Sequence, residues 1–77
     1  METKKDKLDF AKERAYEYLK RPDNYIAAWS SFCSDLLNAD LKDDTGIMAA
    51  LEIGTSMLVS GAIKSNEEMR RFIDGFN

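Results

Sequence analysis

The chain of 77 residues contains no histidine, and its four glycines are widely spaced. Histidine is the commonest general base near neutral pH and the commonest ligand of transition metals. A phosphate-binding loop needs several glycines close together, and no such cluster is present. We therefore expect a protein that is not an enzyme and that carries no cofactor and no metal ion.

The chain has one cysteine, so it cannot form an internal disulfide. Cys33 lies near Trp29 and Phe32, which predicts a small buried apolar side chain rather than a nucleophile. The first seven residues are polar and lack the apolar core of an export signal. A reducing cytoplasm is the expected location.

Basic residues are slightly outnumbered, with 11 Lys and Arg against 14 Asp and Glu, for a net charge of −3. This balance lacks the basic face of a general nucleic-acid binder. The lysines and arginines of residues 4–21 could contact phosphates, but acidic residues alternate with them and cancel most of the field. A nucleic-acid-associated regulator that uses this basic segment is therefore the alternative function, and a nucleic-acid partner is not favoured.

Charge is scarcest in residues 45–63, where Glu52 is the single charged side chain among nineteen. A surface helix normally gives one side to charged groups. The length suits a membrane span, but Glu52, Thr55, Ser56 and Ser60 argue against one. We expect this helix to be covered by the rest of the chain or by a partner.

The spacing of apolar residues is helical throughout, and no run alternates as a β-strand does. Helices are predicted over residues 4–20, 24–38 and about 45–62, with a fourth that starts at Ser65. The expected fold is all-α. It is a single domain, residues 1–77, built as a small four-helix bundle-like structure with the third helix buried at its centre.

Several helix ends are marked by capping residues. Asp23 or Asn24 can cap the second helix. Ser65 and Glu68 have the spacing of a capping box, in which each side chain accepts a hydrogen bond from the other residue's N–H. Gly61 suits either close helix packing, like Gly54, or the end of the third helix.

Residues 41–52 partly resemble a calcium-binding EF-hand loop, with Glu52 at the position of the last ligand. However, Leu41 stands where the first coordinating aspartate should be. Asp44 or Thr45 can instead cap the third helix. We therefore predict a capped helix start here rather than a calcium site.

Apolar residues outside the expected core are candidates for partner contacts. Phe10 lies about 160° from Leu8 around the first helix, and it either contacts a partner, lies under a second neighbour or stacks on Arg14. On the second helix, residues 25–37 carry a broad apolar face. The expected partner-binding residues are Phe10, Tyr16, Met48, Ile53, Val59 and Ile63. For the last four, this expectation holds if the rest of the chain leaves them uncovered.

These observations favour a small non-catalytic protein-interaction module. We expect a regulator or inhibitor that acts by covering the surface of a protein partner. The partner can be a second copy of the chain, which would make a homodimer.

Overall fold

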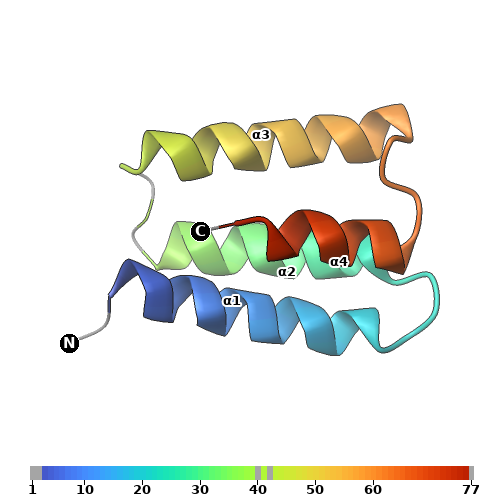
Figure 1. Ribbon diagram of the computed structural model, residues 1–77, viewed down its shortest axis with the longest axis horizontal. Helices are drawn as coiled ribbons and strands as arrows, with labels where there is room; N and C mark the ends of the chain where they lie inside the picture. Colours follow the sequence, from blue (N-terminus) through green and yellow to red (C-terminus); the bar gives the residue numbers. More distant parts are fainter. Residues whose placement is uncertain (1–2, 40, 42, 77) are drawn as a thin grey trace.

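The computed structural model describes residues 3–39, 41 and 43–76, and these residues contain helices and no strand (Figure 1). The all-α class with four helices is confirmed. The helices are α1 (Lys4–Leu19), α2 (Tyr25–Asn38), α3 (Thr45–Ser60) and α4 (Asn66–Asp74).

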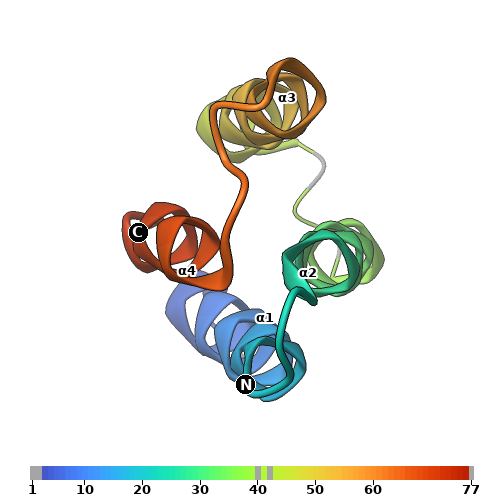
Figure 2. The ribbon, with the colours of Figure 1, turned by 90° about the vertical axis from the view of Figure 1, so that its right-hand side faces the viewer.

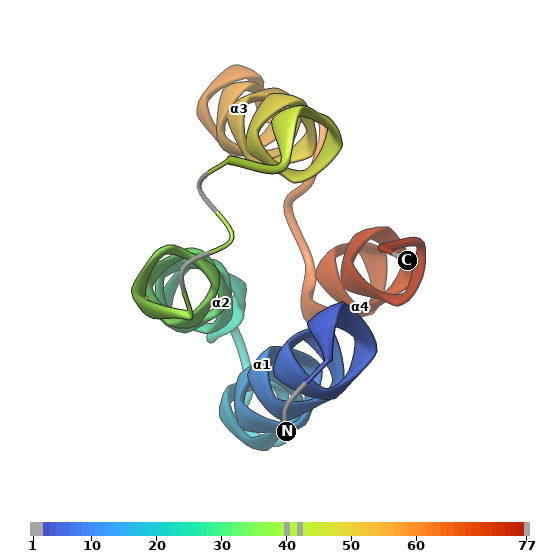
Figure 3. The ribbon, with the colours of Figure 1, turned by 90° about the vertical axis from the view of Figure 1, so that its left-hand side faces the viewer.

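The third helix lies at the edge of the bundle rather than at its centre. Figures 2 and 3 show α3 set apart from α1, beyond α2 and α4. The backbones of α1 and α2 approach most closely, followed by α1 with α4 and α2 with α4. On α3 only Ile47, Leu51 and Gly54 are buried. The prediction of a central buried helix is wrong, because scarcity of charge did not require burial and the apolar Ile53 and Val59 are exposed.

The short helix α4 supplies much of the core. Met69 and Ile73 are fully buried, and Phe72 and Phe76 lie on the same side, as their spacing predicts. The ring of Phe76 packs edge-on against Phe32 of α2, with 4.9 Å between ring centroids. An aromatic cluster of Trp29, Phe32, Phe72 and Phe76 therefore joins α2 to the C-terminal part of the chain.

Trp29 attaches α3 to this aromatic cluster. Its indole N–H donates to the hydroxyl of Thr55 over 3.1 Å. Its ring lies against Gly54, where an added Cβ would be 2.8 Å from Phe72 and closer still to the indole. Gly54 is closely packed, but against the aromatic rings of Trp29 and Phe72 rather than, as was predicted, against the backbone of another helix.

Of the two roles considered for Gly61, the structure shows the end of the helix, one to two residues earlier than the predicted boundary. Gly61 has φ 84°, a left-handed conformation that favours glycine. The N–H of Ala62 donates to the carbonyl of Met57 over 2.8 Å, and that of Gly61 donates to Leu58 over 3.3 Å. This is a Schellman motif, which turns the chain away from the axis of α3.

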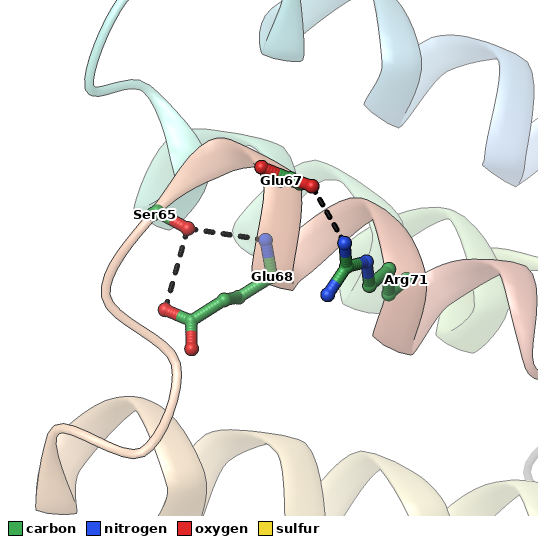
Figure 4. A network of polar contacts seen from close by, with 4 residues as sticks. All are labelled: Ser65, Glu67, Glu68 and Arg71. Carbon is green, nitrogen blue, oxygen red and sulfur yellow. Dashed lines mark hydrogen bonds and ion pairs between the residues drawn. The ribbon is translucent and has the colours of Figure 1, made fainter.

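Two helix starts show how far capping residues could be predicted. The Ser65 hydroxyl accepts from the N–H of Glu68 over 3.1 Å, as expected (Figure 4). The Glu68 carboxylate, however, accepts from the N–H of Lys64 and from the Ser65 hydroxyl instead of the Ser65 N–H. At α1 a complete capping box links Thr3 and Asp6, which the sequence analysis missed.

The predicted cap of α2 is wrong, because the Asn24 side chain donates to the carbonyl of Tyr18 instead of capping the helix. Asn66, the first residue of α4, binds the segment that precedes α2. Its carbonyl oxygen accepts from the Asn24 N–H over 3.0 Å. Its amide donates to the carbonyls of Leu19 and Arg21 over 3.2 and 2.6 Å. One side chain therefore ties the α1–α2 connection to α4.

Replacing Asn66 with alanine is expected to lower the free energy of unfolding by about 1–2 kcal/mol, because three hydrogen bonds are lost at a partly solvated site. Urea denaturation followed by circular dichroism measures this change. Asn38→Ala is the matched control, since Asn38 is exposed and its amide makes a long 3.5 Å contact with Ser34. Equal effects of the two substitutions would show that Asn66 does not tie these elements together.

Candidate functional site

Exposed apolar side chains gather along one side of α2. Ile26, Ser30, Cys33 and Leu37 follow one another at spacings of four, three and four residues, so they share a side of the helix. Ile26 and Leu37 are 61% and 51% exposed, and Cys33 is half-buried. Ile26, Cys33 and Leu37 belong to the broad apolar face predicted for this helix, and that face is wider than the neighbouring helices cover.

A matching row lies on α3. Thr55 points toward α2, because it accepts the hydrogen bond of Trp29. Met48 and Glu52 lie seven and three residues before Thr55, and Val59 lies four residues after it. At these spacings all three share the side of α3 on which Thr55 lies. Val59 is 85% exposed, the most of any large apolar residue among those described.

The two rows run alongside each other. Helices α2 and α3 are antiparallel (Figure 1), and the Trp29–Thr55 hydrogen bond fixes their relative position. Stepping along both helices from this pair places Ile26 near the level of Val59, and Leu37 near the level of Met48. We call this surface the α2–α3 face. It consists of Ile26, Ser30, Cys33, Leu37, Met48, Glu52, Thr55 and Val59.

The structure separates the four candidate residues predicted around the third helix. Met48, which is half-buried, and Val59 belong to the α2–α3 face. Ile53 is exposed on the other flank of α3, beside an open groove that Ser56 also lines. Ile63 is 2% exposed, so it is not available to a partner. Its prediction is wrong because the helix was extended past Gly61, where the chain actually folds back to the core.

The two candidate aromatics of α1 lie away from the α2–α3 face. Phe10 is exposed, and the guanidinium of Arg14 lies 5.7 Å from its ring centroid. Tyr16 is half-buried and donates a hydrogen bond to Asp74 of α4. Burial and this carboxylate raise the pKa of Tyr16 to about 12. Tyr16 therefore joins α1 to α4 within the domain, whereas Phe10 stays exposed beside Arg14.

Basic side chains of α1 make contacts within the fold. Lys4 lies 2.7 Å from the Asp44 carboxylate at the start of α3. This lysine, together with the N–H of Ile47, lowers the pKa of Asp44. Lys12 donates to the carbonyl of Phe76 over 2.6 Å, near the C-terminal end of α4 where a cation is favourable. Part of the basic charge of α1 is thus directed at neighbouring helices.

Asp44 is the residue that caps α3. Its side chain accepts from the N–H of Ile47 over 3.0 Å, which confirms the predicted helix start. The helix begins at Thr45, so the chain does not wrap around an ion there as an EF-hand loop does. Residues 40 and 42 of this segment lie outside the described part. Among the described residues no cluster of potential metal ligands is found.

Within 3–39, 41 and 43–76, none of the helices combines the length and the apolar character that crossing a membrane requires.

Cys33 is expected to react slowly with alkylating reagents. Burial raises the pKa of its thiol from 9.0 to about 11, so the reactive thiolate is about 100-fold scarcer near neutral pH than for a free cysteine. Because the folded state holds this proton more tightly, the associated stability is fully present below pH 9 and is lost as the pH rises toward 11. The iodoacetamide rate from pH 7 to 11, compared between folded and urea-unfolded protein, measures the shift. Identical pH profiles would contradict burial of the thiol.

Comparison of the chain with protein-family models, with curated proteins and with solved structures found no match. The functional assignment therefore depends on the surfaces of this molecule alone.

Proposed function

We propose that the protein is a non-catalytic interaction module that binds a protein partner through the α2–α3 face. The observation that supports this proposal is the alignment of Ile26, Leu37 and Val59, all exposed, on two adjacent helices. Covering a fully exposed side chain of this size contributes about 1.5–3 kcal/mol, and these three are 51–85% exposed, so each contributes part of that amount to association. Exposed apolar side chains that gather on one face, rather than standing singly, are typical of binding sites.

The size of the face favours reversible binding. A standard interface buries about 800 Å² on each partner, about one-sixth of the 5089 Å² accessible surface of this molecule. The α2–α3 face is formed by eight side chains, fewer than the roughly 20–30 residues that each partner contributes to a standard interface. An interface of this size suits a regulator or inhibitor that binds and releases its partner in the cytoplasm.

The alternative, a nucleic-acid-associated regulator, has less support. Lys4, Lys12 and Arg14 of α1 contact groups on the other three helices, including Asp35 of α2 at 3.3 Å from Arg14. Their charges are partly neutralised where phosphates would have to bind. The α2–α3 face carries no basic side chain, so it suits a protein surface better than a nucleic acid.

The proposal is tested by chemical cross-linking in an extract of the native host. The double variant Ile26→Ser, Val59→Ser is expected to reduce the recovery of a specific partner at least tenfold, because two anchors are lost. Ile53→Ser is the matched control, since Ile53 is similarly exposed on the other flank of α3. Circular dichroism confirms that both variants fold. Unchanged recovery with the double variant, or loss with the control, would exclude the α2–α3 face.

Self-association is a separate outcome of the same proposal. Sedimentation equilibrium at high micromolar concentration distinguishes a homodimer from a monomer. A strict monomer removes the homodimer version and leaves binding to a different protein.

A further inference from the structure

The α2–α3 face carries its one charge near its centre. Ile26 and Leu37 are eleven residues apart, about 16 Å along α2. The midpoint between Ile26 and Leu37 lies at the level of Glu52 on α3, as counted along both helices from the Trp29–Thr55 pair. Within residues 3–39, 41 and 43–76, no lysine or arginine forms an ion pair with Glu52. The face is thus apolar at both ends and negative in the middle.

This arrangement disfavours a second copy as the occupant. A symmetric dimer pairs a surface with itself around a two-fold axis. An axis perpendicular to the helices would match the Ile26 end of one copy with the Leu37 end of the other and bring the two Glu52 carboxylates together, and like charges facing each other at an interface are unfavourable. An axis parallel to the helices would place each Glu52 on α2 of the other copy, which has no lysine or arginine to pair with it.

We infer that the occupant is an amphipathic helix of a different protein, with a lysine or arginine between two apolar side chains on its binding side. This inference rests on the proposed function and specifies the partner. A helix lying between α2 and α3 would place its apolar residues on Ile26 with Val59 and on Leu37 with Met48. Its central cation would meet Glu52, which gives the pairing charge complementarity.

Three designed helical peptides test the inference. They are covalently stapled and share two leucines spaced like Ile26 and Leu37, and they differ at one central residue, which is arginine, glutamine or glutamate. Fluorescence anisotropy of labelled peptide gives the affinity. Trp29 is the sole tryptophan and lies beside the face, so its emission reports whether binding occurs there.

The arginine peptide is expected to bind the protein about tenfold more tightly than the glutamine peptide, and the glutamate peptide more weakly than both. Glu52→Lys is expected to reverse this order. Glu67→Lys is the matched control. This substitution makes the same change of charge on the exposed side of α4, where Glu67 pairs with Arg71 (Figure 4). The control is expected to keep the original order.

Each remaining outcome contradicts the role of Glu52, the helical nature of the partner or the proposed function. Equal affinity of the three peptides, or a reversal caused by Glu67→Lys, removes the role assigned to Glu52. If no peptide binds while cross-linking still depends on Ile26 and Val59, the helical partner is wrong and the proposed function stands. If cross-linking is independent of Ile26 and Val59, the proposed function itself fails.

Discussion

Replacing Phe32 with alanine is expected to lower the free energy of unfolding by about 3–5 kcal/mol. Phe32 is fully buried and contacts Trp29 and Phe76 within the aromatic cluster. Its removal leaves a cavity at the junction of α2 and α4, in addition to losing the transfer free energy of the ring. A domain of this length has a total stability of about 4–12 kcal/mol, so the variant is expected to be largely or partly unfolded at 37 °C.

Phe10→Ala is the matched control, because it removes the same ring from an exposed position on α1. Its expected effect is within about 0.5 kcal/mol. Thermal and urea denaturation of both variants, followed by circular dichroism, give the comparison. Similar losses of stability at the two positions would contradict the placement of Phe32 in the core.

Replacing Gly54 with alanine is expected to destabilise the protein by about 1–3 kcal/mol, although alanine favours helix over glycine by about 1 kcal/mol. The added methyl would press on the indole of Trp29 and on Phe72, which are held by other rings. The least costly response is for α3 to move outward, which would strain the hydrogen bond to Thr55. We therefore expect a shifted Trp29 emission together with the loss of stability.

Gly75→Ala is the control for this substitution. Gly75 has an ordinary φ of −75°, and a Cβ there meets only normal van der Waals contacts. Its expected effect is neutral or stabilising by about 0.4–1 kcal/mol. Chemical denaturation measures both variants. A stabilising effect of Gly54→Ala, with unchanged Trp29 emission, would show that the indole does not hold α3.

The sequence was sufficient for the features that depend on nearby residues. The four helices, the caps at Asp44 and Ser65 and the left-handed turn at Gly61 are local, because each depends on residues within about five positions. The apolar side of α4 was also predictable, since Met69, Phe72, Ile73 and Phe76 repeat at the helical period.

Features that depend on contacts between distant segments were not predictable. Nothing around Asn66 indicates that its amide binds the α1–α2 connection more than forty residues earlier. A lack of charge in α3 could not show which of its sides the other helices reach, so the exposure of Ile53 and Val59 could be expected only conditionally. Ile26 and Leu37 had a usable signal, because an apolar face that broad exceeds what one or two neighbours cover.

The α2–α3 face can be examined directly by hydroxyl-radical footprinting of the protein, purified alone and in native-host extract at the same concentration. We expect Ile26, Leu37 and Val59 to be oxidised in the purified protein and protected in the extract. Ile53 and Phe10 should be oxidised equally in both. Protection of Ile53 or Phe10 in the extract, without protection of Ile26, Leu37 and Val59, would contradict the assignment of the α2–α3 face as the binding surface.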